Sequence, residues 1–238
     1  MDVLSDCPTF IDLRDFASNG VARVQGDPFG LGRNLLPIRP APVEIGSIHL
    51  DAGVGSAAAM PGDNFLVVVS GEVTLTTPSD TVRLRSGESC VIGSGTAFDW
   101  VAPVATVLVF MRYLGTAKAA PGIIAIDAAA QLTPSGAPLA ELLVGETPSC
   151  RNHTSFTSAD GEFMCGVWDS TPYYRRSMGY RHFELMVLLD GSVTFVDELK
   201  HSRTYSKGDI FLIEQGAHCS WESREDVAKI YAIYRPAA

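Results

Sequence analysis

The fold can be recognised from two neighbouring apolar runs, Glu184-Leu-Met-Val-Leu-Leu-Asp-Gly191 and Gly208-Asp-Ile-Phe-Leu-Ile-Glu-Gln-Gly216. A related pair occurs earlier, as Asn64-Phe-Leu-Val-Val-Val-Ser-Gly71 and Gly87-Glu-Ser-Cys-Val-Ile-Gly-Ser-Gly95. The offset between the two pairs is about 120 residues throughout, and Trp100 and Trp221 keep the same offset. A constant offset indicates an internal duplication, so the chain contains two copies of one unit.

Both copies consist of short apolar runs that are rich in β-branched and aromatic residues and are bounded by Gly, Pro, Asp and Ser. The turns Ser70-Gly71 and Asp190-Gly191 fit tight connections in which glycine takes a positive φ. This pattern predicts an all-β chain with a small sandwich or barrel in each copy. The predicted strands are Phe65–Ser70, Glu72–Thr77, Thr81–Leu84, Cys90–Ile92, Thr106–Tyr113, Leu185–Leu189, Ser192–Val196, Arg203–Tyr205, Ile210–Ile213 and Val227–Tyr234.

The seam between the copies is predicted near Gly115–Gly122, where Gly, Ala and Pro follow the last apolar run of the first copy. This gives a first domain of residues 1–117 and a second of residues 118–238. The Ala-, Pro- and Gly-rich residues up to Pro148 predict a connecting segment with at most one short helix.

Composition excludes several classes of function. The chain has 238 residues, a net charge of −9 and a pI near 5.0, so it lacks the basic surface that binds nucleic acids or anionic membranes. The five cysteines are scattered and show no CxxC spacing, which argues against a disulfide framework or a structural zinc site. With no apolar stretch long enough to span a bilayer and no signal-like start, we expect a cytoplasmic protein.

The second copy resembles the two cupin motifs in Glu184-(x)6-Gly191 and in Gly208-(x)5-Glu214-x-Gly216-(x)2-Cys219. Trp221 and the stretch Gly166-Val-Trp-Asp-Ser-Thr-Pro172 resemble, more narrowly, the cupin subfamily of ethanolamine-utilisation protein Q. The resemblance covers about Glu44–Tyr113 and Phe163–Arg235. It implies two tandem cupin barrels of the double-stranded β-helix or jelly-roll type, a bicupin, and it leaves the chemistry open because cupins host many activities.

The chain departs from the metal-binding cupins in informative ways. Of the histidines and the glutamate that hold the metal in that family, only the glutamate is present, as Glu184, and Cys219 stands where the late histidine is expected. In the first copy Asn64 replaces the glutamate, while Met60 and Phe98 stand at histidine positions. The first copy is therefore predicted to be a degenerate, structural half, and the second to carry the ligand site.

Residues i, i+2 and i+4 of a strand share one face, so Tyr180, His182 and Glu184 are predicted to point into the second barrel together. A carboxylate in a partly apolar cavity has a raised pKa unless it is paired. This indicates acid/base chemistry with Glu184 as the base and His182 or Tyr180 as its partner. The alternative is that Glu184 forms a structural hydrogen bond with His182 or Tyr180.

A divalent metal, zinc or iron(II), is a second possibility, with Glu184, His182 and Cys219 as its ligands. Against this, the usual cupin ligands are largely missing, and Cys219 can equally be a small buried hydrophobe.

Trp168, Arg181 and Trp221 are candidate substrate-binding residues of the second barrel. Positive charge from Arg181 and from the run Tyr173-Tyr174-Arg175-Arg176 would suit an anionic metabolite such as a carboxylate or phosphate. Aromatic core packing and a solvated loop are the alternative interpretations.

Two functions remain open at this point. The first is a small-molecule-binding bicupin that performs acid/base or metal-assisted chemistry on a small polar metabolite in the C-terminal barrel. The second is a ligand-binding or scaffold dimer without turnover. The family resemblance and the need to cover sheet edges both favour a homodimer.

Overall fold

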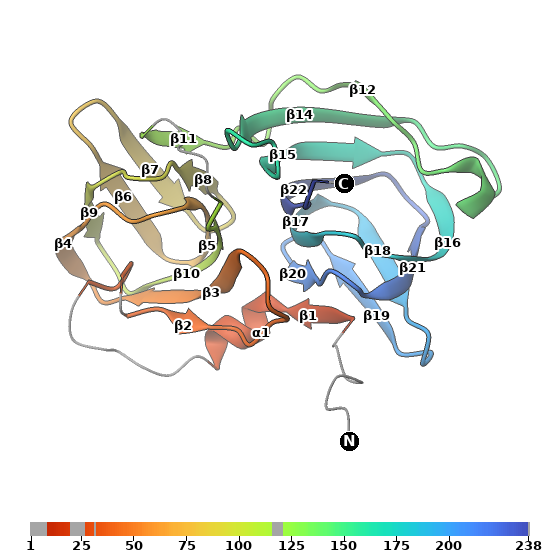
Figure 1. Cartoon of the computed structure of the whole chain (residues 1–238), viewed down its shortest axis with the longest axis horizontal. Helices are drawn as coiled ribbons and strands as arrows, with labels where there is room; N and C mark the ends of the chain where they lie inside the picture. The colour runs from red at the N-terminus through yellow and green to blue at the C-terminus, as the bar shows by residue number, and fades with distance from the viewer. Residues whose placement is uncertain (1–8, 20–26, 31, 116–120, 238) are drawn as a thin grey trace. The chain divides into compact units, whose positions relative to one another are not determined.

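The computed structural model describes residues 9–19, 27–30, 32–115 and 121–237, and almost all of its regular structure is β (Figure 1). These residues form two compact units. The N-terminal unit comprises Leu13–Ile126 together with Phe156–Cys165. The C-terminal unit comprises the residues up to Asp12 together with Asp127–Ser155 and Gly166–Ala238. The predicted fold class, two tandem all-β cupin units, is confirmed.

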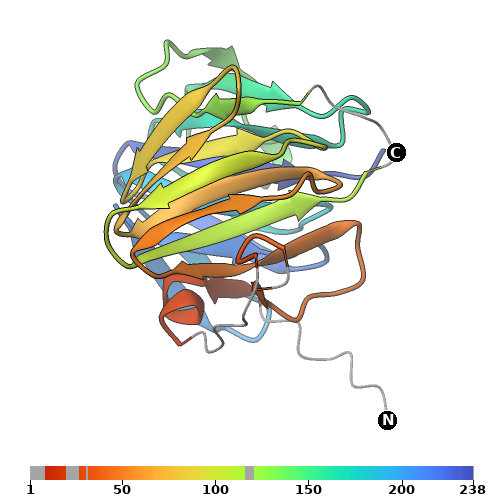
Figure 2. The same ribbon diagram turned by 90° about the vertical axis from the view of Figure 1, so that its left-hand side faces the viewer.

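The N-terminal unit contains a six-stranded antiparallel sheet in the order β11-β8-β5-β10-β3-β2 and a four-stranded sheet in the order β4-β9-β6-β7. Figure 2 shows its long strands, coloured from orange to green, lying side by side across one face. The strands are β2 (Asn34–Leu35), β3 (Val43–Leu50), β4 (Gly53–Ala57), β5 (Asp63–Ser70), β6 (Glu72–Thr76), β7 (Thr81–Arg85), β8 (Ser89–Ile92), β9 (Phe98–Ala102), β10 (Thr106–Tyr113) and β11 (Ile123–Ala125), and the helix α1 (Leu13–Ser18) precedes them.

The C-terminal unit repeats this plan with a larger sheet, β1-β20-β17-β22-β15-β14-β12, and a smaller one, β13-β16-β21-β18-β19. Its strands are β1 (Phe10–Asp12), β12 (Thr133–Ser135), β13 (Leu143–Val144), β14 (Cys150–Thr157), β15 (Phe163–Ser170), β16 (Tyr173–Gly179), β17 (Phe183–Asp190), β18 (Ser192–Val196), β19 (Ser202–Ser206), β20 (Ile210–Ile213), β21 (His218–Ser223) and β22 (Val227–Tyr234), with one 3₁₀ turn at Ala140–Leu142.

Equivalent glycines show that the two units share one packing plan. A Cβ atom on Gly46 would lie 2.1 Å from the backbone oxygen of Asn34, and one on Gly166 would lie 2.1 Å from the backbone oxygen of His153. In each unit the neighbouring strand, β2 or β14, therefore passes so close to this position that only glycine fits. Because these glycines are about 120 residues apart in the sequence, the duplication extends to this detail.

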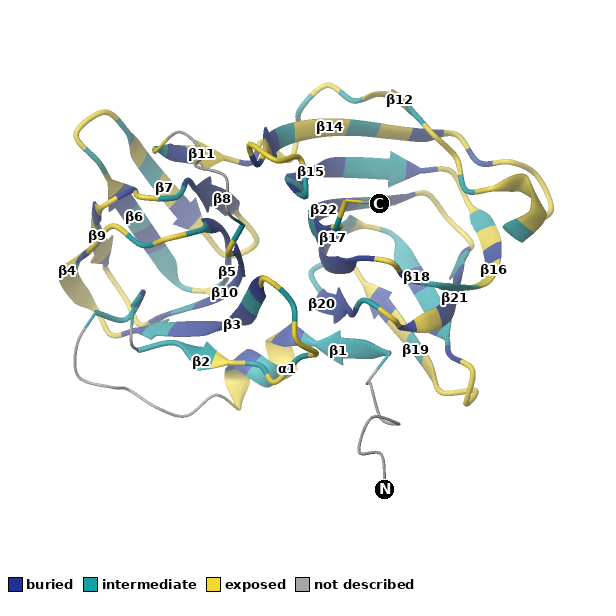
Figure 3. Ribbon diagram, viewed as in Figure 1, coloured by how far each residue is buried: buried dark blue, intermediate teal, exposed yellow. Residues whose placement is uncertain are grey.

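Each unit encloses one apolar core between its two sheets. In Figure 3 buried residues follow the strands, whereas the hairpin ends are exposed. The core of the N-terminal unit is almost wholly aliphatic and aromatic and contains Phe29, Phe98 and Trp100. The core of the C-terminal unit is more aromatic, and Phe195 packs edge-to-face against Tyr205, Phe211 and Trp221.

The predicted strands occur with nearly the expected bounds, and the predicted turn glycines Gly71 and Gly191 have φ values of 85° and 72°. Residues 116–120 of the predicted seam lie outside the described residues. The prediction for the connecting segment was incomplete, because β11, β12 and β13 occur there beside the one short helical turn. These short strands add to the edges of sheets, which a scan for apolar runs does not detect.

Residues Phe10–Asp12 differ from their predicted place in the domain of residues 1–117. β1 pairs with β20 of the C-terminal unit, placing Ile11 opposite Leu212. Phe10 packs on Phe195 with ring centroids 5.9 Å apart, and Asp12 accepts a hydrogen bond from Arg203. A three-residue strand has too little pattern of its own to indicate which sheet edge it will join.

None of the described helices has the length and apolar character needed to cross a membrane.

Candidate functional site

Strand β17 supplies the polar group at the centre of the C-terminal barrel. Glu184, Met186 and Leu188 alternate with residues of the opposite face, and Met186 and Leu188 belong to the core between the sheets. Tyr180 lies just before β17 and is held by backbone hydrogen bonds to Ala217 and Gly216. Tyr180, His182 and Glu184 are all buried, as the alternation predicted.

The Glu184 carboxylate lies between two nitrogen groups. Its Oε1 accepts a hydrogen bond from Lys229 Nζ at 2.7 Å, and its Oε2 lies 3.2 Å from His182 Nε2. The exposed fractions are 6% for Glu184 and 7% for Lys229, so this ion pair is shielded from solvent. The structure therefore brings Glu184 and His182 together, and it adds a lysine that the sequence analysis did not single out.

Lys229 reaches Glu184 along the inside of the barrel. Its Cα lies opposite Leu188 on the neighbouring strand, so the side chain passes Met186, whose Sδ is 3.2 Å from Nζ. The ammonium group lies 4.8 Å from the ring centroid of Trp168 and 5.0 Å from that of Trp221, which are cation–π distances. The two candidate tryptophans thus form a wall around the lysine.

A signal for Lys229 is present in the sequence. It is the one charged residue within the run Val227–Tyr234, and its counterpart in the first copy is Leu108. A charge that appears only in the second copy, on a strand that is otherwise apolar, indicates an internal partner such as Glu184.

A second polar group lies on the other sheet, around Arg175 of β16. Its Nη2 donates to Tyr180 Oη at 3.3 Å and to the backbone oxygen of Cys219 at 3.2 Å, and the guanidinium lies 5.2 Å from the Tyr180 ring centroid. Arg175 is 7% exposed, its Nε is buried without a hydrogen-bond partner, and no carboxylate of the described residues forms an ion pair with it. A buried guanidinium without a counter-charge is a site that an anion would complete.

The proton affinities of this cluster do not favour Glu184 as a base. Burial alone would raise the pKa of Glu184, but the charge of Lys229 and the hydrogen bond from His182 outweigh it and hold the pKa well below its usual range. A carboxylate that stays ionised and already accepts two hydrogen bonds has little tendency to remove a proton from a substrate. Burial raises the pKa of Tyr180, so its hydroxyl remains protonated.

The proposed metal site is not supported. No three His, Cys, Asp or Glu side chains in the described part of the chain are placed where they could hold a metal ion. Glu184 is engaged by Lys229, and burial raises the pKa of Cys219 to about 12, whereas a metal needs the thiolate. The residues do not fit a cupin metal because an ammonium group already occupies the carboxylate that would bind it.

Of the remaining candidate residues, Cys219 and Trp221 are buried and Arg181 is exposed. Cys219 is fully buried in the core, in agreement with the alternative interpretation of it as a small hydrophobe. Trp221 is also buried and stacks on Tyr173 with ring planes 12° apart. Arg181 is exposed and lies outside the cluster, because it alternates with Tyr180 and His182 and so faces the other way. Of the basic run at the barrel wall, Arg175 is the residue that points inward.

The equivalent position of the N-terminal unit contains Asn64, which is 3% exposed and whose amide oxygen and nitrogen have no hydrogen-bond partner among the residues that the structure describes. Arg112 lies opposite Asn64 in the register and contacts Met60 Sδ at 3.0 Å. This unit was predicted to be a degenerate, structural half, and Asn64 and Arg112 are polar residues beside its apolar core.

Comparisons with known proteins agree with this architecture. The family model described as the EutQ-like cupin domain matches residues 157–231. A crystal structure of a DUF861-family protein of unknown function from Pseudomonas syringae is 35% identical, with a TM-score of 0.82 over 88% of this chain and 89% of that one. No curated protein matches the sequence.

More distant structures share the fold alone. A cupin 2 conserved barrel domain protein from Leptotrichia buccalis is 12% identical with a TM-score of 0.62, over 96% of this chain and 97% of that one. The DUF861 protein Ylba from E. coli is 15% identical with a TM-score of 0.54, over 94% and 98%. The extent and identity of the match to the Pseudomonas protein show that the chain belongs to the DUF861 family of cupins, with a EutQ-like cupin domain in its C-terminal half.

Proposed function

We propose that the C-terminal barrel binds a small anionic metabolite, with a carboxylate as the group that Arg175 recognises. The observation that carries the proposal is the buried guanidinium of Arg175, which has no carboxylate partner among the described residues and an Nε with no hydrogen-bond acceptor. Leaving a charged group buried and unpaired costs several kcal/mol, roughly 3–5 when one partner of a pair is removed. A bound carboxylate would offset that cost through hydrogen bonds to the planar guanidinium.

The surrounding residues support a ligand of mixed character. Tyr180 lies between the two polar groups, since it hydrogen-bonds Arg175 and its ring lies 5.1 Å from that of His182. Tyr173 and Trp221 supply apolar surface beside Arg175. A ligand with one carboxylate and an apolar or aromatic body would match these walls.

This proposal favours binding over turnover. The lowered pKa of Glu184 and its pairing with Lys229 remove the base that acid/base chemistry would need. In this interpretation the Glu184–Lys229 pair fixes the barrel wall and the position of the two tryptophans. The homodimer stays a prediction, which size-exclusion chromatography with light scattering tests.

Ligand-dependent thermal shifts test the proposal. Acetate, succinate and benzoate are compared with their uncharged counterparts acetamide, succinamide and benzamide. We expect at least one carboxylate to raise the melting temperature in a concentration-dependent way, because a ligand that binds only the folded state stabilises it. The shift should vanish in Arg175→Gln and shrink in Arg175→Lys, which keeps the charge but lacks the planar fork.

Arg176→Gln is the matched control, because it removes the same charge from the next residue. Arg176 is exposed and donates to the backbone oxygen of Glu141 at 3.1 Å. Its variant should respond to carboxylates as the wild type does. The proposal is wrong if no carboxylate of the panel shifts the wild type, or if Arg175→Gln, folded by circular dichroism, shows the same shift.

A further inference from the structure

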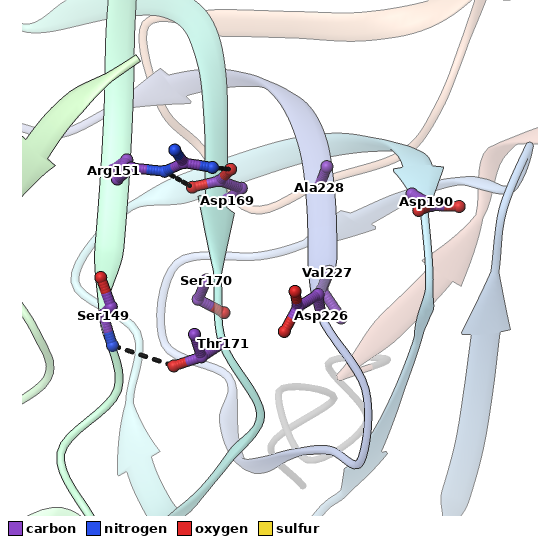
Figure 4. A pocket seen from close by; sticks show the side chains of 9 residues that line it. All are labelled: Ser149, Arg151, Asp169, Ser170, Thr171, Asp190, Asp226, Val227 and Ala228. Carbon is purple, nitrogen blue, oxygen red and sulfur yellow. Dashed lines mark hydrogen bonds and ion pairs between the residues drawn. The ribbon is translucent and has the colours of Figure 1, made fainter.

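A pocket of about 340 Å³ lies on the C-terminal unit where the ends of β15 and β17 meet the starts of β14 and β22, and Arg175 and Tyr180 are not among its lining residues (Figure 4). Its lining is rich in acidic and hydroxyl side chains: Ser149, Arg151, Asp169, Ser170, Thr171, Asp190, Asp226, Val227 and Ala228. A volume of this size accommodates a small molecule.

The positively charged residue in the lining of this pocket, Arg151, is already paired with an aspartate. Arg151 forms a two-point contact with Asp169, with Nε donating to Oδ1 at 3.0 Å and Nη2 donating to Oδ2. Asp190 forms a wide contact of 3.5 Å with Lys207, and both side chains of that pair are largely exposed, so it is weak. No side-chain hydrogen bond or ion pair joins Asp226 to another described residue, although its charge is close enough to help raise the pKa of Arg151. The Asp226 carboxylate oxygens can therefore still accept hydrogen bonds from a ligand.

Ser170 is an independent indication of a ligand. It is 3% exposed, and its hydroxyl has no hydrogen-bond partner in the part of the chain that the structure describes. In Figure 4 its oxygen points from β15 toward the side of the pocket that holds Asp226. Most buried hydroxyls are paired in folded proteins, so an unpaired one that also lines a pocket can serve as a hydrogen-bond partner for a ligand there.

We propose that this pocket binds a small primary alkylammonium, with its NH₃⁺ group between the Asp226 carboxylate and the Ser170 hydroxyl. A primary ammonium has three N–H donors and no acceptor, which matches a site whose two free groups can both accept. Val227 and Ala228 give the alkyl part an apolar surface. A metal ion fits less well, since no group of described residues has the ligands to hold one.

Isothermal titration with butylammonium tests the proposal on the full-length protein. Tetramethylammonium, which carries the charge without N–H donors, and butyrate, which has the opposite charge, are the comparison ligands. We expect saturable binding of butylammonium and binding at least 10-fold weaker for tetramethylammonium. Any heat that butyrate produces should be the same in Asp226→Asn as in the wild type, because it would come from the Arg175 site. Asp226→Asn should weaken butylammonium binding at least 10-fold, and Asp99→Asn, which changes an exposed aspartate of the other unit, should leave it unchanged.

Ser170→Ala separates a ligand site from a packing defect. Without amine the variant should melt at the same temperature as the wild type or above it, because a buried unpaired hydroxyl is removed. With amine it should gain less stability than the wild type and bind several-fold more weakly. The proposal is overturned if the wild type does not bind butylammonium, or if Asp226→Asn and Ser170→Ala bind it as tightly as the wild type. Arg175→Gln should not alter amine binding, so the outcome is independent of the carboxylate site.

Discussion

Lys229 Nζ lies 2.7 Å from Glu184 Oε1, and both side chains are more than nine-tenths buried inside the C-terminal barrel. The lysine takes the carboxylate that cupins of the metal-binding type offer to their ion, as the resemblance of Glu184 to the cupin glutamate implies. Its ammonium group is shielded by Trp168 and Trp221. Lys229 therefore supplies a positive charge from the chain itself inside this barrel. Trp168 and Trp221 pack around that charge, so their positions should depend on Lys229.

Removing one member of this pair should destabilise the protein more than removing both. We expect Glu184→Gln to lower the free energy of unfolding by about 3–5 kcal/mol, because Lys229 is left as an unpaired buried charge. The double variant Glu184→Gln with Lys229→Met should recover most of that loss, since methionine can pack beside Met186 and the tryptophans. Urea unfolding of the wild type, both single variants and the double variant measures this coupling.

An ion pair on the surface provides the control for this comparison of single and double variants. Glu72 contacts Arg83 at 2.7 Å and Arg85 at 3.3 Å, on a face open to solvent. Glu72→Gln should change the free energy of unfolding little, because exposed pairs are screened by water. If Glu72→Gln and Glu184→Gln lowered the free energy of unfolding equally, the Glu184–Lys229 pair would not be shielded from solvent.

The stability that Glu184 contributes should depend on pH with a definite sign. The pKa of Glu184 is lowered in the folded protein from an ordinary value of 4.5, so between the two values the unfolded chain binds more protons than the folded one. The contribution is fully present above about pH 4.5 and is lost as the pH falls toward the folded pKa. The stability difference between wild type and Glu184→Gln should therefore narrow on acidification.

Urea unfolding of both proteins at pH 7, 5, 4 and 3 measures this difference. The other carboxylates are the same in the two proteins, so their contributions to the pH dependence cancel in the difference between the two free energies of unfolding. A difference that stays constant down to pH 3 would show that Glu184 has no lowered pKa.

The strands and the fold could be predicted from the sequence, because the apolar runs are short, rich in β-branched and aromatic residues and bounded by turn residues, and because the same runs occur in both copies. Placing Tyr180, His182 and Glu184 together was likewise possible from alternation alone. The residues that contact this group from other strands could not be predicted from alternation. Lys229 meets Glu184 from β22 and Arg175 meets Tyr180 from β16, and such meetings depend on register between strands that no local pattern fixes.

The first strand of the chain should stabilise the C-terminal unit rather than the N-terminal one. Phe10 of β1 packs on Phe195, so Phe10→Ala should destabilise that unit by about 1–3 kcal/mol for a partly buried aromatic. In a Trp100→Phe background, fluorescence reports only Trp168 and Trp221, and the denaturation midpoint of this signal should fall. Leu35→Ala, a substitution of a half-exposed residue on β2, should not move it. An unchanged midpoint in Phe10→Ala would show that β1 does not support this sheet.

The amide of Asn64 should be a source of instability in the N-terminal unit. It is buried beside a core of apolar side chains, and neither of its polar atoms is paired with a described residue, whereas its counterpart Glu184 has two partners. An unpaired buried polar group costs about 1–3 kcal/mol, so Asn64→Leu, which keeps the approximate volume, should raise the free energy of unfolding by an amount in that range. Asn152→Leu on β14 should give no such gain, because the half-exposed Asn152 can hydrogen-bond to water. A lower melting temperature for Asn64→Leu would contradict the interpretation of Asn64 as an unpaired, destabilising amide.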